Sequence, residues 1–156
     1  MVQKISESKQ FFLFKIGLLL LISLITTSEQ LFAERFSIIA DKANIRSGPG
    51  AEYDILWQVE KHYPILVIQK RGSWYLFSDF EDDKGWVHKS LLGKTKTVIT
   101  LRDGKNNVRK EPSMKSEKAF FVEKGVPFKV IKNKGRWLYI KHSDGDMGWI
   151  YDSLVW

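Results

Sequence analysis

The chain has 156 residues, of which 44% are hydrophobic and 28% are charged, a composition typical of a globular protein. It contains no cysteine, so neither a disulfide framework nor a catalytic thiol is available to it. The formal net charge of +7 favours anionic partners.

Residues 1–33 predict a secretory signal peptide. Lys4, Lys9 and Lys15 give a basic start, an apolar stretch covers residues 16–25, and the segment ends on the small residue Ala33. The alternative is a membrane anchor that stays attached, but the uncharged run over residues 16–28 is shorter than the ~20 residues of a spanning helix. We therefore expect an exported protein, periplasmic or extracellular, that is cleaved near Ala33.

Residues 34–93 predict about five short strands and no amphipathic helix. One β-prone run covers residues 36–46 with a break at Asp41-Lys42, and the others cover 55–59, 64–69, 74–77 and 85–88. A turn is expected at 47–50 and a charged hairpin loop at 79–84. A single 3₁₀ turn is expected over 90–92. The pattern favours a small all-β barrel over an open sheet, because five short strands in an open sheet would leave edges exposed.

Residues 94–156 repeat this unit at a constant offset, 107 − 44 = 63, without insertion or deletion. The matching anchors are Asn44-Ile45-Arg46 with Asn107-Val108-Arg109, Trp74 with Trp137, and Gly85-Trp86 with Gly148-Trp149. The predicted fold is all-β, with two tandem small barrels at 34–93 and 94–156 after an N-terminal signal peptide helix. Formal charge differs between them, at −1 for the first repeat and +7 for the second.

Comparing the two copies assigns faces to the strands, since successive side chains point to opposite sides. Leu138 and Ile140 mark the core face of residues 137–140, which places Trp137 and Tyr139 on the half-exposed face. By the same argument Val87 and Ile150 belong to the core. Trp86 and Trp149 then share a face with His88 and Tyr151.

The motifs Asn44-Ile45-Arg46-Ser47-Gly48-Pro49-Gly50, Trp74-Tyr75 and Gly85-Trp86-Val87-His88 resemble the bacterial Src-homology-3-like (SH3b) domain. The resemblance covers nearly all of residues 36–156 and is strongest to the tandem version in exported bacterial proteins. It implies two partly open, SH3-like barrels that act as targeting or binding modules of the cell envelope, often on peptidoglycan or beside wall-active enzymes. The second copy departs from the pattern, because Lys110-Glu111-Pro112-Ser113 lacks both glycines of the first loop.

The sequence offers no catalytic set, so we expect no enzyme activity, no metal and no cofactor. The histidines His62, His88 and His142 occupy unmatched positions of the repeat, and no phosphate-binding or dinucleotide glycine pattern is present. The acidic residues of one hairpin loop are better interpreted as solvated charge than as zinc ligands; they are Asp79, Glu81, Asp82 and Asp83.

Recurring aromatic and arginine residues are the candidate binding groups. Flat indole faces can stack on sugars or peptides, and an arginine beside a loop can hold a carboxylate with two hydrogen bonds. The candidates are Arg46, Tyr53, Trp74, Trp86, Arg109, Trp137 and Trp149. The alternatives are that the tryptophans cover barrel edges or fill the contact between the repeats, and that each arginine holds loop carbonyls.

A basic face is predicted on the second repeat, from Lys129, Lys132, Lys134 and Arg136. It would attract anionic wall groups or lipid head groups, whereas an exported protein rarely meets nucleic acid. The alternative is that these residues only keep a small domain soluble.

Together these features predict an exported, non-enzymatic binding or targeting module of the bacterial envelope that recognises peptidoglycan or a wall-associated protein. Two alternatives stay open. One is an accessory protein that retains wall-hydrolase activity, and the other is a purely structural protein–protein interaction module.

The predicted cleavage fixes the first residue of the exported chain. Mass spectrometry of the exported protein should show a chain that starts at Glu34. Recovery of the full-length chain from the membrane fraction would instead favour the retained anchor.

Overall fold

Short runs of β-branched and aromatic residues form thirteen strands, β1 to β13, in the computed structural model, which describes residues 33–156. Apart from Ala33, the predicted signal peptide and its helix lie outside the described residues. Within the described range the helical elements are two 3₁₀ turns, and none is long and apolar enough to cross a membrane.

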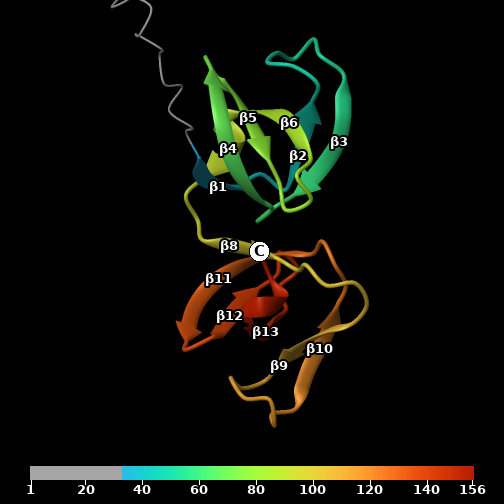
Figure 1. The fold of residues 1–156 in the computed structure, drawn as a ribbon, viewed down its shortest axis with the longest axis vertical. Coiled ribbons are helices and arrows are strands. Elements are labelled where there is room, and N and C mark those ends of the chain that lie inside the picture. Colours follow the sequence, from blue (N-terminus) through green and yellow to red (C-terminus); the bar gives the residue numbers. More distant parts are fainter. Residues whose placement is uncertain (1–32) are drawn as a thin grey trace, which may run out of the picture. The chain divides into compact units, whose positions relative to one another are not determined.

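The first repeat forms one antiparallel sheet with the strand order β3-β2-β6-β5-β4-β1-β7 (Figure 1). Its elements are β1 (Glu34–Ile38), β2 (Lys42–Arg46), β3 (Ile55–Glu60), β4 (Pro64–Arg71), β5 (Trp74–Ser78), β6 (Lys84–His88), η1 (Lys89–Leu91) and β7 (Leu92–Gly93). The predicted 3₁₀ turn is therefore confirmed, one residue earlier than expected.

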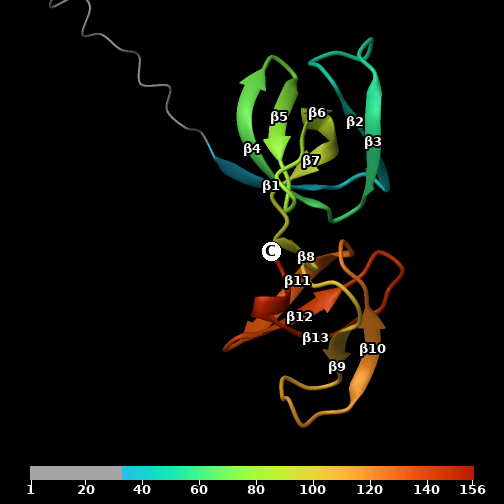
Figure 2. The same cartoon turned by 45° about the vertical axis from the view of Figure 1, so that its right-hand side comes forward.

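The second repeat forms its own sheet with the corresponding strand order β10-β9-β13-β12-β11-β8 (Figure 2). Its elements are β8 (Thr97–Ile99), β9 (Asn106–Arg109), β10 (Lys118–Val122), β11 (Pro127–Lys134), β12 (Trp137–Lys141), β13 (Met147–Tyr151) and η2 (Asp152–Leu154). The two sheets thus reproduce the repeat that the sequence predicts.

The predicted barrels are not closed, because the terminal strands of each sheet do not pair with each other. Both sheets are curved all the same. Register shifts between Val67 and Gln69 in β4, and between Val130 and Lys132 in β11, place a bulge at the same point of each repeat. The free edges β3 and β10 carry charged side chains such as Glu60 and Lys118, which discourage pairing with other chains.

Each repeat buries its own small hydrophobic core. In the first, Ile38, Ile45, Ile65, Val67, Phe77 and Val87 are inaccessible to solvent. The second is built on Val108, Phe128, Ile140 and Ile150, with Leu138 partly buried against them. The predicted core faces are confirmed, since Ile140, Val87 and Ile150 point inward and Trp137 and Tyr139 stay half-buried.

The interpretation of Asp79 as a solvated loop charge is wrong. Its side chain is only 6% exposed and accepts hydrogen bonds from the backbone N–H groups of Glu81 and Asp83. It also accepts a bond from the Tyr63 hydroxyl at 2.8 Å. Burial, followed by this hydrogen bond, holds the pKa of Tyr63 far above its ordinary value. Asp79 therefore shapes the β5–β6 loop from inside.

Two glycines allow β6 and β13 to meet the neighbouring strands. A Cβ on Gly85 would lie 2.2 Å from Cγ2 of Ile45, and a Cβ on Gly148 would lie 2.5 Å from Cγ1 of Val108. The same added atom on Gly148 would lie 3.0 Å from the backbone oxygen of Arg109. Any larger residue must push the paired strands apart.

We predict that Gly148→Ala lowers the free energy of unfolding by about 1–3 kcal/mol, because the added methyl overpacks a filled core. Urea unfolding followed by tryptophan fluorescence measures the loss. Gly50→Ala is the matched control, since the atoms nearest to its methyl belong to the flexible side chain of Glu52. Equal stability of Gly148→Ala and the parent would contradict the close approach.

We predict that Tyr63→Phe destabilises the protein by about 1 kcal/mol near neutral pH, through the lost bond to Asp79. Because folding raises the pKa of Tyr63, its neutral phenol stabilises the fold below about pH 10, and this stabilisation is lost as the pH rises further. The difference in unfolding free energy between parent and variant should therefore shrink above about pH 10. A difference that stays constant up to pH 11.5 would contradict the assignment.

Candidate functional site

Four aromatic side chains lie on the outer side of β12 and β13 in the second repeat, where Trp149 is buried at 9% exposure and the other three are half-buried. The register pairs Tyr139 with Trp149 and Trp137 with Tyr151. Ring centroids lie 5.1 Å apart in the first pair and 5.2 Å apart in the second. We call Trp137, Tyr139, Trp149 and Tyr151 the outer aromatic face.

Cationic side chains lie over these rings. The ammonium of Lys132 is 5.0 Å from the Tyr139 ring centroid and 5.6 Å from that of Trp149. The guanidinium of Arg136 is 4.7 Å from the Tyr151 ring and pairs with Asp152 at 2.9 Å. Its hydrogen bond to Asp152 holds the pKa of Arg136 above the ordinary value. The face therefore combines flat rings with positive charge.

A cleft of about 260 Å³ opens at the Trp137–Tyr151 end of this face. It is lined by the arginines Arg102 and Arg109, the rings of Trp137 and Tyr151, and the smaller groups of Asn107, Met114, Ser153 and Leu154. Arg109 donates one hydrogen bond to the backbone oxygen of Ser116 at 2.6 Å, which fixes its guanidinium at the wall of the cleft. A guanidinium has five donors, so others remain for a ligand.

The first repeat places its predicted residues in the equivalent positions. Arg46 pairs in register with Trp86, and Trp74 packs edge-on against His88 at 5.3 Å. Arg46 donates to the backbone oxygen of Tyr53 at 2.7 Å. Both arginines therefore hold a loop carbonyl, which is the structural alternative raised from the sequence.

The surrounding side chains differ between the repeats. The positions of Lys132, Arg136 and Tyr139 are taken in the first repeat by Gln69, Ser73 and Leu76, so its outer face lacks the overlying cations.

The two loops also differ in how they are filled. Tyr53, 42% exposed, lies so close to Gly48 that an added Cβ would meet its ring at 2.2 Å. In the second repeat Glu111 and Ser116 replace this pair, and the Glu111 N–H donates to the Ser116 hydroxyl at 3.0 Å. Gly48 is needed because the Tyr53 ring lies against it. The second loop has Ser116 in place of this tyrosine, so it can accommodate Glu111 in place of the glycine.

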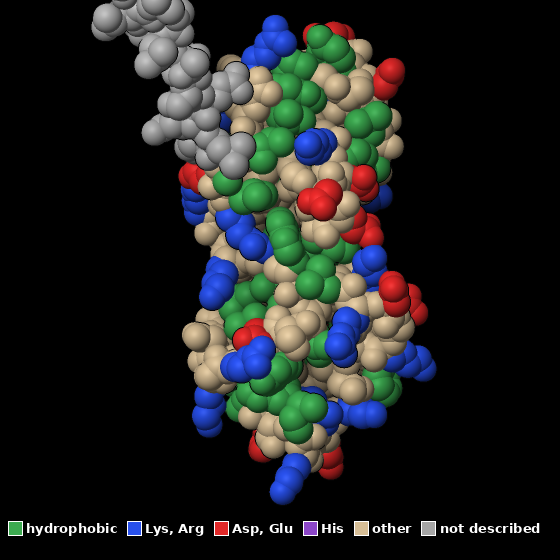
Figure 3. Space-filling view, viewed as in Figure 1, with side chains coloured by type: hydrophobic (Ala, Val, Ile, Leu, Met, Phe, Trp, Pro, Cys, Tyr) green, Lys and Arg blue, Asp and Glu red, His purple; other side chains and the backbone are tan. Residues whose placement is uncertain are grey.

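Two of the four residues of the predicted basic face contact aromatic rings of the same repeat, and the other two are exposed. Lys132 and Arg136 lie over aromatic rings, whereas Lys129 and Lys134 are exposed on β11. Figure 3 shows that, in the view it gives, basic side chains gather mainly over the second repeat.

Sequence reasoning did not select Arg102, Asn107, Met114, Tyr139 or Tyr151 as binding residues. Tyr139 and Tyr151 could have been selected by pairing the predicted strands across the hairpin, because their register with Trp149 and Trp137 follows from the loop length. Arg102 and Met114 come from loops, whose paths the strand pattern does not specify. Between residues 33 and 156, no three histidine or acidic side chains lie close enough together to hold a metal ion.

Comparison with known proteins finds a curated relative and several structural neighbours. The relative, from Bacillus subtilis (strain 168), is named "Putative N-acetylmuramoyl-L-alanine amidase YrvJ" and is 28% identical over 130 residues. The match covers 76% of this chain and 24% of the relative, so the chain spans about a quarter of that protein.

Two of the structural neighbours are an NlpC/P60 family protein from Bacillus cereus and NlpC1 from Trichomonas vaginalis. Each is 11% identical, with TM-scores of 0.38 and 0.35. The matches cover 79% and 83% of this chain, and 56% and 47% of the two neighbours.

The family profile described as "Bacterial SH3 domain" matches the chain twice, over residues 40–94 and 103–156. These ranges contain the paired Arg, Trp and Gly positions of both repeats. The chain therefore belongs to the bacterial SH3 domain family, as a tandem of two such domains.

Proposed function

We propose that this protein is a non-enzymatic binding module of the bacterial envelope, and that it recognises peptidoglycan through the outer aromatic face and cleft of its second repeat. Family membership supports a wall-associated role, as does a relative whose name is that of an amidase acting at N-acetylmuramoyl-L-alanine. The predicted signal peptide would deliver the protein outside the cytoplasm.

The observation on which the proposal depends is the cleft that joins two arginines to aromatic walls. Sugar rings have flat apolar faces that stack on indole and phenol rings, and Trp137 and Tyr151 offer such surfaces. A carboxylate beside the sugar would meet Arg102 or Arg109, because a guanidinium presents paired donors. An amino sugar that bears a carboxylate or an acidic peptide combines both features.

The proposal assigns binding, rather than hydrolysis, to this chain. The amidase-named relative shares only a quarter of its length with the chain, and the shared part contains the two SH3-type repeats. None of the residues that line the cleft forms a nucleophile–base pair of the Ser–His or Cys–His kind.

We predict that the protein sediments with purified wall sacculi, and that Arg102→Gln together with Trp137→Ala weakens this binding at least about tenfold, since a central aromatic and an arginine commonly dominate an interface. Arg102 and Trp137 both lie at the surface of the cleft, so the fold should survive, as circular dichroism can verify. The control changes Trp74→Ala, the counterpart of Trp137, together with the exposed Arg71→Gln in the first repeat.

Two further measurements distinguish the alternatives. Binding should weaken with added salt, because exposed charges are screened within a Debye length of ~8 Å at physiological ionic strength. Larger losses from the first-repeat control would place the site on the first repeat. Release of soluble fragments above the level of a heat-killed sample would refute the non-enzymatic assignment, and failure to sediment at low salt would refute wall binding.

A further inference from the structure

A second type of cavity occurs in both repeats, between the free edge strand and the loop of the following hairpin. In the first repeat it is lined by Trp57, Gln58, Val59, Glu60, Tyr63 and Glu81, together with Lys42, Phe80 and Gly125. In the second it is lined by Phe120, Phe121, Val122, Glu123, Val126, Phe128, His142, Asp144 and Asp146. We call the second cavity the acidic pocket.

The two cavities are equivalent by sequence as well as by position. Trp57 corresponds to Phe120, Glu60 to Glu123, and Glu81 to Asp144, each at the repeat offset 120 − 57 = 63. Each cavity therefore has an aromatic wall, a buried valine, and carboxylates from both the strand end and the hairpin loop, two in the first repeat and three in the second. The recurrence of this combination argues against a chance hollow.

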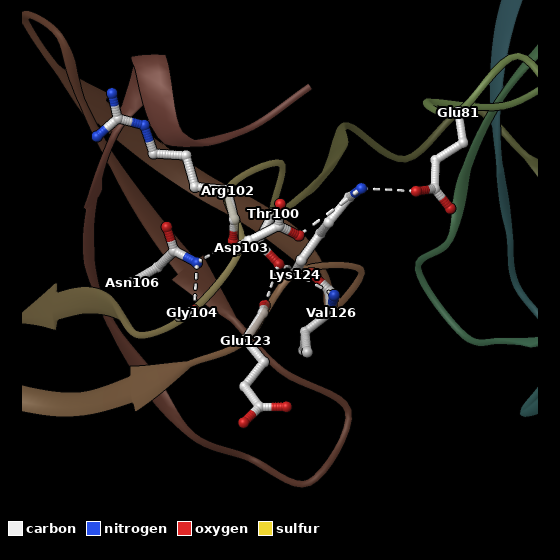
Figure 4. Close-up of polar contacts among 9 residues, drawn as sticks. All are labelled: Glu81, Thr100, Arg102, Asp103, Gly104, Asn106, Glu123, Lys124 and Val126. Atoms are coloured by element: carbon white, nitrogen blue, oxygen red, sulfur yellow. Dashed lines mark hydrogen bonds and ion pairs between the residues drawn. The ribbon is translucent and has the colours of Figure 1, made fainter.

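In the first repeat one carboxylate of this cavity, that of Glu81, already pairs with an ammonium group at the cavity's edge. The Nζ atom of Lys124 lies 2.7 Å from Oε1 of Glu81 (Figure 4), and the adjoining Gly125 lines the cavity. The hydrogen bond to Glu81 holds the pKa of Lys124 above its ordinary value. In the first repeat, therefore, the Glu81 carboxylate pairs with a lysine ammonium group.

The turn that presents Lys124 is fixed by the buried side chain of Thr100. Its hydroxyl donates to the backbone oxygen of Glu123 at 2.6 Å and accepts from the backbone N–H of Val126 at 3.0 Å (Figure 4). Gly125 takes a φ of +81°, which suits glycine. The hydrogen bonds of Thr100 therefore fix the turn from which Lys124 reaches Glu81.

The acidic pocket of the second repeat has no such cation. Among residues 33–156, neither Glu123 nor Asp146 has a lysine or arginine nitrogen within 4 Å, and Asp144 approaches only His142, at 3.4 Å. Lys105 and Lys118 lie over the neighbouring ring of Phe121, 5.3 and 5.1 Å from its centroid. The carboxylates of this pocket are thus available to an external ammonium.

We propose that the acidic pocket binds the ammonium group of a lysine-type side chain on a peptide. Its cavity of about 290 Å³ has an apolar floor of Phe120, Val122 and Phe128 that suits an aliphatic stem, while Glu123, Asp144 and Asp146 surround the charged end. Lys124 of a second copy is a poorer occupant than a peptide lysine, because Lys124 is already paired with Glu81 of its own chain.

This site is separate from the outer aromatic face, so it can be tested without wall material. Nα-acetyl-lysine methylamide is titrated into ¹⁵N-labelled protein, with the norleucine analogue, which has a similar stem and no amine, as the matched probe. The amides of His142, Asp144 and Asp146 should shift with the lysine probe alone. A triple change of Glu123→Gln, Asp144→Asn and Asp146→Asn should weaken binding at least about tenfold, while Glu111→Gln with Glu117→Gln should leave it unchanged.

Lys124→Ala provides the second test, because it removes the resident cation from the first cavity. The variant should acquire a second group of lysine-responsive amides around Glu60 and Glu81. The proposal is overturned if the amides of residues 142–146 do not shift, if norleucine shifts them equally, or if Lys124→Ala gains no new site. Concentration-dependent dimers that disappear in Lys124→Ala would overturn the peptide as occupant in favour of a second copy.

Discussion

The close approach of β6 to β2, and of β13 to β9, is the constraint on which both repeats depend. Gly85 and Gly148 lie against Ile45 and Val108, where no Cβ fits. This contact aligns Arg46 with Trp86 and Arg109 with Trp149 across the strands. The curvature that brings an arginine beside an aromatic surface in each repeat therefore follows from a backbone contact, and the glycine is needed for packing rather than for ligand binding.

On this common framework the two repeats present different surfaces. Lys132, Arg136 and Tyr139 give the second repeat a face of rings and cations, whereas the first has Gln69, Ser73 and Leu76 in the same places. Substitutions on an outward strand face leave the core unchanged, so the surface of one copy can diverge while its fold is kept. The excess positive charge of the second repeat is part of this divergence.

The hairpin loops differ for a related reason. Asp79 in the first repeat is buried and organises its loop through backbone N–H groups and Tyr63. His142 takes the equivalent position in the second, packs 5.4 Å from Phe128 and lies near Asp144. One loop is thus fixed internally by its acid, while the other keeps its carboxylates at the rim of a cavity.

The sequence by itself determined the repeat, the all-β class and the inward faces of the strands, because a constant offset and alternating polarity are local properties of the chain. Ile140, Ile150 and Val87 were assignable to the core on that basis. Only the tertiary structure decided that the sheets stay open, that Asp79 is buried, and that Arg102 and Met114 reach the cleft beside Trp137. These features depend on loop paths and on contacts between distant strands, such as the pairing of Lys124 with Glu81, which no local pattern encodes.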